Sequence, residues 1–191
     1  MRPVWIKAIV LLAAVWIVAG GVIWWARSQK PTPDHLLAYV ESHPIQGMSS
    51  GDRSKTIEKV ARQLNGLTYV ERREIRLNRK LDGFFGSLST DEQSRFLDLT
   101  LPEGFKQMME ALNKMKPEDR KIFVERTLKE MQKQEGREIP AEARERFLED
   151  RNAQKIIDQG LKSFYSEASA ETKMDVAPIL EQMQRNLQGF R

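Results

Sequence analysis

"LSTDEQSRF", residues 88–96, gathers the side chains that start an α-helix into nine positions. The hydroxyl of Ser89 can accept a hydrogen bond from the amide of Glu92, and the carboxylate of Glu92 can reach back to the amide of Ser89. Acids in a first turn also favour the positive end of the helix dipole. Because each polar group has a use at a helix start, the stretch predicts a helix and not a catalytic site.

The same arrangement recurs along the chain, with further starts at Met48, Leu67, Met115 and Ile139. Two of these starts repeat the hydroxyl and acid, as Ser49 with Asp52 and Thr68 with Glu71, and the other two place Pro117 and Pro140 in the first turn, where proline is tolerated. Five residues after each of the five starts stands a long polar side chain: Arg53, Arg72, Gln93, Arg120 and Arg144. The starts are 19, 21, 27 and 24 residues apart. Such unequal spacing favours recurring helix caps over a solenoid repeat.

Between these starts, apolar side chains repeat with the period of amphipathic helices, and no stretch alternates as a strand does. The apolar stripes run over residues 36–40, 57–64, 70–88, 105–115, 124–131, 147–164 and 179–187. Pro178 lies inside this last pattern and is expected to kink its helix or split it in two. The sequence therefore predicts an all-α fold: a single N-terminal transmembrane helix followed by a soluble domain of about seven or eight helices.

The first part of the chain is predicted to be a membrane anchor. Residues 4–26 are apolar apart from Lys7, and 23 residues of helix reach about 34 Å, enough to cross the hydrocarbon core of a bilayer. The residues expected to hold the span are its apolar start, its aromatic ends and its flanking cations: Val4, Trp5, Lys7, Trp24, Trp25 and Arg27. A cleaved signal peptide is the alternative, but the apolar run continues beyond the small residues Ala19 and Gly20. The predicted organisation is an anchor over residues 1–27, a polar linker with prolines over 28–33 and a helical domain over 34–191.

The net charge of +4 is unevenly distributed. Arg2, Lys7 and Arg27 give +3 over residues 1–27, which leaves +1 for residues 28–191. Charges flank the span on both sides, and the positive-inside rule favours an internal amino terminus, with the helical domain outside the cytoplasm. A nearly neutral domain with both signs intermixed disfavours nucleic acid as a partner. The chain contains no cysteine, which excludes disulfides and thiolate chemistry.

Three groups of residues are candidate sites, each with a simpler structural interpretation. His35 and His43, with Glu41 nearby, could bind a metal ion, but two histidines eight residues apart do not chelate from one helix face. A basic stripe at helical spacing could meet an anionic surface, or it could be a solvated face: Arg72, Arg76, Arg79 and Lys80. A stripe rich in methionine could form a partner groove, or it could be core: Phe105, Met108, Met109, Leu112 and Met115.

Catalytic motifs are missing from the sequence. It has no nucleotide-binding glycine loop, HExxH or GxSxG pattern, and both histidines lie outside the main body of the domain. Acid pairs are numerous, but nothing selects one for hydrolysis. We therefore expect a protein that is not an enzyme and needs no cofactor.

Leu88, Ser89 and Glu92 resemble part of the LTxxQ motif of small periplasmic helical proteins related to stress chaperones and metal-resistance sensors. Glu92 stands at the position of the glutamine, and Gln93 follows one residue later. "LTYVE", residues 67–71, has the first two residues of the motif and ends in glutamate. Neither stretch completes the motif, so the chain is not assigned to that family.

The leading hypothesis is a single-pass, membrane-anchored helical protein that binds a partner protein or organises an assembly, with its domain on the periplasmic side of a bacterial inner membrane. One alternative is a periplasmic ligand-responsive module that senses metal or stress or acts as a chaperone. The other is a cytoplasm-facing domain that binds lipid or nucleic acid through the basic stripe. The sequence does not identify the partner.

Overall fold

The computed structural model describes residues 31–135 and 149–188, and these two stretches contain eight helices and no strand. The helices are α2 (Pro33–Ser42), α3 (Ser50–Gly66), α4 (Tyr69–Leu77), α5 (Asp82–Gly86), α6 (Thr90–Lys114), α7 (Pro117–Glu135), α9 (Arg151–Glu167) and α10 (Ala170–Gln188). The predicted all-α class is confirmed for this part of the chain. The predicted anchor and the first half of the linker lie outside the described residues, and so does the start at Ile139. Within the described ranges, no helix combines the length and apolarity needed to span a bilayer.

The predicted helix starts are found where the polar residues placed them. Thr68 with Glu71 and Ser89 with Glu92 form complete capping boxes at the starts of α4 and α6. At α3, Ser49 accepts from the amide of Asp52 and its hydroxyl donates to the carboxylate of Asp52. The helix α7 begins at Pro117. Local capping chemistry therefore decides where these helices begin.

At three of the described starts, the long polar residue five places further along turns back across the preceding junction, whereas Arg72 donates to Asn65 and Thr100. Arg53, Gln93 and Arg120 each occupy the fourth position of their helix, and each donates to a carbonyl eight residues earlier, on Ile45, Phe85 and Leu112 respectively. These carbonyls lie where the chain leaves one helix for the next, where intrahelical donors run out. The recurring side chain thus closes the junction between successive helices.

One predicted stripe is wrong. Residues 70–88 were expected to show a single apolar face, but α4 ends at Leu77 and α5 begins only at Asp82. Arg79 adopts a left-handed backbone conformation with φ of 53°, which breaks the helical path. Val70 and Leu77 are 72% and 66% exposed, while Ile75, which was not in the stripe, is the buried residue of α4.

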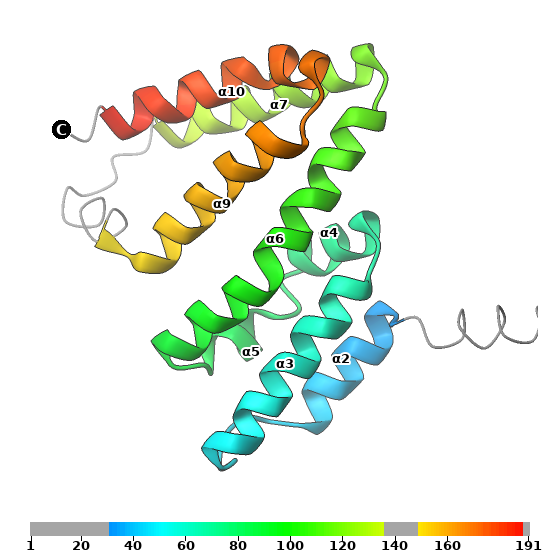
Figure 1. Ribbon diagram of the computed structural model, residues 1–191, viewed down its shortest axis with the longest axis vertical. Helices are drawn as coiled ribbons and strands as arrows, with labels where there is room; N and C mark the ends of the chain where they lie inside the picture. The colour runs from blue at the N-terminus through cyan, green and yellow to red at the C-terminus, as the bar shows by residue number, and fades with distance from the viewer. Residues whose placement is uncertain (1–30, 136–148, 189–191) are drawn as a thin grey trace, which may run out of the picture.

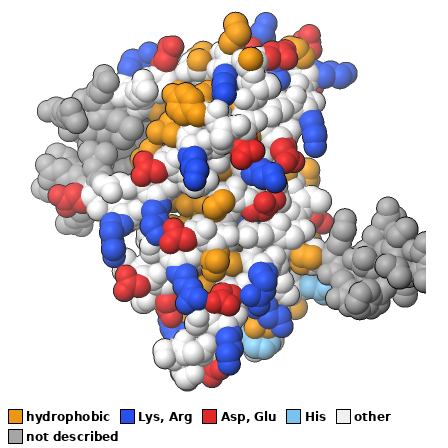
Figure 2. All heavy atoms as spheres, in the orientation of Figure 1, with side chains coloured by type: hydrophobic (Ala, Val, Ile, Leu, Met, Phe, Trp, Pro, Cys, Tyr) orange, Lys and Arg blue, Asp and Glu red, His pale blue; other side chains and the backbone are white. Residues whose placement is uncertain are grey.

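The helix α6 joins two hydrophobic cores. Its first half contributes Phe96 to a core built with α2, α3, α4 and α5, and its second half contributes Met109 and Leu112 to a core built with α7, α9 and α10. Figure 1 shows α6 as a diagonal spine, with α9 along one side and the pair α7 and α10 across its far end. Figure 2 shows Lys, Arg, Asp and Glu side chains interspersed over this face.

Proline is accommodated inside two of the helices. Pro178 was predicted to kink its helix or split it in two, and the split is wrong, because α10 runs from Ala170 to Gln188. The helix α6 likewise contains Pro102. The residues four places earlier, Asp98 and Met174, are exposed, so water can hydrogen-bond the carbonyls that lose an amide donor.

Candidate functional site

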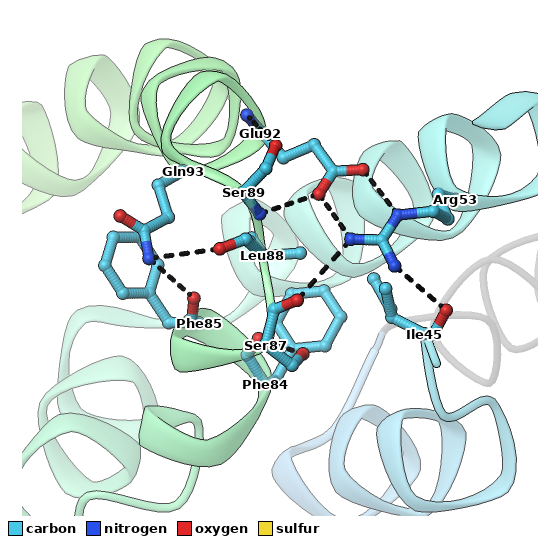
Figure 3. Close-up of polar contacts among 9 residues, drawn as sticks. All are labelled: Ile45, Arg53, Phe84, Phe85, Ser87, Leu88, Ser89, Glu92 and Gln93. Carbon is cyan, nitrogen blue, oxygen red and sulfur yellow. Dashed lines mark hydrogen bonds and ion pairs between the residues drawn. The ribbon is translucent and has the colours of Figure 1, made fainter. Parts of the chain in front are cut away.

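The stretch that starts α6 carries a polar network beside the first core, and Figure 3 shows its members. The carboxylate of Glu92 accepts from Nε of Arg53 at 2.7 Å and from Nη2 of Arg53 at 2.5 Å, and it also accepts from the cap amide of Ser89 at 2.8 Å. Arg53 further donates to the carbonyls of Ile45 and Ser87. The hydrogen bonds from Arg53, followed by those from Ser89, lower the pKa of Glu92 to about 2, and the same ion pair raises the pKa of Arg53.

This network holds helices together and leaves no carboxylate oxygen free to act as a base. Arg53 comes from α3, Ser87 follows α5 and Glu92 lies in the first turn of α6, so one guanidinium joins three elements. Both oxygens of Glu92 are already hydrogen-bonded, and a carboxylate with a pKa of about 2 is a poor base at neutral pH. We therefore assign the Arg53–Glu92 pair to the helix junction and look for the functional site elsewhere.

A cavity of about 410 Å³ lies between α4, α5 and α6, with contributions from α3 and α9. Its volume falls within the range typical of small-molecule sites. The residues around it are mostly apolar or cationic: Leu64, Tyr69, Arg72, Arg73, Ile75, Arg76, Leu81, Asp82, Phe85, Phe96, Thr100, Leu101, Gly104, Phe105, Met108 and Ile156. We refer to this cavity as the α4–α6 pocket.

Two glycines let large side chains reach the pocket. A Cβ atom on Gly104 of α6 would lie 3.2 Å from Cζ of Arg72, so the guanidinium rests against the helix backbone. A Cβ on Gly160 of α9 would lie 3.2 Å from Cε1 and Cζ of Phe105, so α9 packs directly on that ring. Both glycines stand inside helices, where glycine costs about 1 kcal/mol relative to alanine. Close packing explains their presence.

Arg72 holds a cationic group at the pocket without an acidic partner in hydrogen-bond contact. Its Nη2 donates to the carbonyl of Thr100 at 2.8 Å and to Oδ1 of Asn65 at 3.1 Å, both neutral acceptors. Its Nη1 is buried and has no hydrogen-bond partner among the described residues. Burial lowers the pKa of Arg72 to about 10, with the neighbouring Arg76 adding to the shift and Glu103 opposing it. The group stays charged at neutral pH, and an anion would relieve its desolvation.

Two further arginines stand at the rim. Arg73 and Arg76 line the pocket and are exposed, and within the described ranges neither forms an ion pair. The one carboxylate on the lining, Asp82, is paired with Arg79. The pocket therefore combines an apolar interior with cations that have room for an anion.

The structure brings together parts of two sequence candidates and separates the rest. Arg72 and Arg76 from the basic stripe meet Phe105 and Met108 from the methionine stripe at the pocket. The stripe itself is not one helical face, because α4 ends before Arg79 and Lys80.

The other methionine-stripe residues do not form a groove. Met109 and Leu112 are 4% and 3% exposed in the second core, and Met115 packs against the same core, so these three belong to the interior.

The histidine candidates serve helix α2. His43 follows its last residue, contacts the carbonyl of Tyr39 through Nδ1 at 3.0 Å and stacks on the Tyr39 ring. The amide of His35 donates to the cap residue Thr32, and Glu41 is exposed. Across the part of the chain that the structure describes, no cluster of three potential ligands could hold a metal ion.

Several pocket residues had no signal in the sequence analysis. Tyr69, Phe85 and Ile156 come from three different helices, and only the packing of those helices brings them together. Gly104 carried a usable signal, since an isolated glycine within a helical pattern often marks a close approach. No protein family, curated protein or solved structure matches this chain, so the site stands on its own geometry.

Proposed function

We propose that this chain is a membrane-tethered helical binding module, not an enzyme, and that the α4–α6 pocket holds an anionic amphiphile: an acyl chain that ends in a carboxylate or a phosphate. The observation that carries the proposal is the Arg72 guanidinium, which lies at the edge of an apolar cavity. Its buried Nη1 has no hydrogen-bond partner among the described residues. A purely apolar ligand would leave that donor without a hydrogen bond. A purely polar ligand would bury no apolar surface against the interior of the pocket.

The two halves of such a ligand match the two halves of the pocket. The anion would accept from Arg72, with Arg73 and Arg76 close by, because guanidinium groups bind carboxylate and phosphate through paired donors. The acyl chain of the ligand would lie against Phe105 and Met108, where each buried methylene group contributes about 0.8 kcal/mol to binding. Methionine suits a flexible chain because its own side chain adapts.

The tether supports the same function. Residues 4–26 have the length and apolarity of a membrane span in the sequence, and a lipid-derived ligand is most abundant beside a membrane. The positive-inside rule favours a domain on the periplasmic side of an inner membrane, and a reporter fused after Arg191 that is active on only one face would test that side.

Photocrosslinking tests the pocket in the full chain. The protein is placed in nanodiscs of zwitterionic lipid and exposed to a fatty acid that carries a diazirine in its chain, and the adducts are located by peptide mass spectrometry. We expect adducts around Phe105 and Met108 that palmitate competes away and hexadecanol does not. The variant Arg72→Met should lose most of the adduct, while Arg126→Met, at an exposed position of α7, should keep it.

Two results would contradict the proposal. Adducts distributed over other helices would mean that the pocket is not the site. Equal competition by hexadecanol would mean that Arg72 takes no part, and the pocket would then be an apolar site only.

A partner protein is a second candidate, favoured by one observation. Tyr165 at the end of α9 and Met174 in α10 are 64% and 78% exposed, and Lys173 donates to the carbonyl of Tyr165 across the turn between these helices. Exposed aromatic and methionine side chains are enriched at interfaces. A photoreactive amino acid at Met174 should then crosslink one discrete protein in membranes, and a matched substitution at Arg126 should not.

A further inference from the structure

The face of α4 that points away from both cores is unusually apolar for an exposed surface. Val70 and Leu77 are 72% and 66% exposed, and they stand seven residues apart, on the same side of the helix after two turns. Arg73 and Glu74 lie between them and are exposed, whereas Ile75 points into the first core. Two large apolar side chains in water, with one cation and one acid between them, form a face that lacks an apolar partner within the described residues.

Positive charge is concentrated on the same segment. Between Tyr69 and Lys80 there are five cations and two acids, a net charge of +3, whereas residues 28–191 as a whole carry only +1 by the same count. Arg72 is engaged with Thr100 and Arg79 is paired with Asp82, while the other three cations are exposed and form no ion pair within the described residues: Arg73, Arg76 and Lys80. A net positive charge on a short exposed segment favours contact with an anionic surface.

The start of the described chain is fixed beside α4. A Cβ atom on Gly66 would lie 2.4 Å from Cγ of Pro31, so the proline ring packs on the backbone of Gly66 at the end of α3, three residues before α4 begins. Figure 1 shows the start of α2 and the connection from α3 to α4 on the same side of the molecule. Pro31 stands four positions after Arg27, a reach of about 14 Å when the chain is fully extended.

We propose that this outward face of α4 lies on an anionic phospholipid bilayer, with Val70 and Leu77 at the level of the headgroups and Arg73 on the phosphates, and that Lys80, just beyond the helix, adds a second cation to the contact. The inference rests on the proposed tether, because a span that ends at Arg27 keeps Pro31, and with it the start of α4, near the surface. Arg73 belongs both to this face and to the rim of the α4–α6 pocket. The contact would therefore hold the pocket where an anionic amphiphile can pass from the membrane.

The chain lacks cysteine, so single reporters can be placed without removing any residue. Full-length Val70→Cys, Leu77→Cys and Met174→Cys, each labelled with the fluorophore NBD, are reconstituted into vesicles of phosphatidylcholine with or without phosphatidylglycerol, and nitroxide headgroup lipids serve as quenchers. We expect strong quenching at positions 70 and 77 in the anionic vesicles and little at position 174, which is 78% exposed on α10. Arg73→Glu should abolish the quenching at position 70, and Arg126→Glu should not.

Flotation after a carbonate wash separates the two proposals. If the protein floats after the wash but the label at position 70 is not quenched, the tether is supported and the bilayer contact is overturned. Quenching at position 70 with chain that the wash releases supports the contact and overturns the tether. Chain that neither floats nor is quenched overturns both.

Discussion

Nη1 of Arg120 donates to the carbonyl of Leu112 at 3.2 Å from inside the second core, where the arginine side chain is 1% exposed. The same guanidinium binds the carboxylate of Asp175 at 2.7 Å and that of Glu171 at 2.9 Å, both on α10. Its ion pair with Asp175 raises the pKa of Arg120, with Glu171 adding to the effect. One side chain thus ties the start of α7 to the end of α6 and to α10.

We expect Arg120→Met to lower the free energy of unfolding by about 2–4 kcal/mol, because the methionine fills much of the space but leaves Asp175 without its cation and removes one hydrogen bond from each of two backbone carbonyls, those of Leu112 and Met115. Chemical denaturation of the full chain measures the loss. Arg126→Met on the exposed side of the same helix should change stability by less than about 0.5 kcal/mol. Equal effects of the two variants would mean that burial of Arg120 has no special role.

The pair of Arg53 and Glu92 predicts a pH dependence. A carboxyl group whose pKa is about 2 in the folded chain and about 4.5 in the unfolded chain contributes stability above pH 4.5, and this contribution is lost as the pH falls towards 2. We expect Glu92→Gln to make stability less dependent on pH across this window. Unfolding curves at a series of pH values measure the slope.

Arg53→Met is the control for this pH dependence, because it removes the cation and leaves the carboxyl group. The pKa of Glu92, followed by NMR, should then return most of the way to its ordinary range, with only the Ser89 bonds still lowering it. A slope that is unchanged in both variants would assign the acid sensitivity to other carboxylates.

Sequence reasoning succeeded where short-range chemistry decides the structure. Ser89 and Glu92 satisfy each other's backbone within one turn, so their spacing alone was enough to predict the start of α6. The recurrence of Arg53 and Arg120 was also visible, but its purpose was not. Their acceptors, Ile45 and Leu112, are backbone carbonyls, which no residue type marks.

The stripe over residues 70–88 failed for a related reason. Its apolar spacing allowed a continuous helix, yet Arg79 takes a left-handed conformation that no proline or glycine at that position announces. Predicting the pocket would have required the tertiary structure, since Phe105 and Ile156 meet only through the packing of α6 with α9. A site that forms only through the packing of distant helices leaves no signal in the composition or the periodicity of the sequence.

Gly104→Ala tests whether the position of Arg72 matters for binding. The new methyl group would lie 3.2 Å from Cζ of Arg72, so the guanidinium must shift by a few tenths of an ångström, which perturbs its hydrogen bonds to Thr100 and Asn65. We expect severalfold weaker photocrosslinking by the fatty-acid probe. Stability should change by less than about 1 kcal/mol, because alanine is also the better helix former.

Gly83→Ala is the matched control for Gly104→Ala. It stands in a helix with no atom within 4 Å of the added carbon, and it should leave probe binding unchanged. Unchanged binding in Gly104→Ala as well would remove Arg72 from the site.

Gly160→Ala tests whether the size of the pocket affects binding independently of the charge of Arg72. Its methyl group would lie 3.2 Å from Phe105, a half-buried ring whose free side faces the pocket, so the ring should move a few tenths of an ångström into the cavity. The cavity should then hold less acyl chain while Arg72 keeps its hydrogen bonds. We expect weaker photocrosslinking by long-chain fatty acids and little change with short ones. The double variant Gly160→Ala with Phe105→Leu removes the collision and should recover much of the long-chain labelling, because the two substitutions share one contact. If the double variant labels no better than Gly160→Ala alone, the ring of Phe105 does not set the space available to the chain.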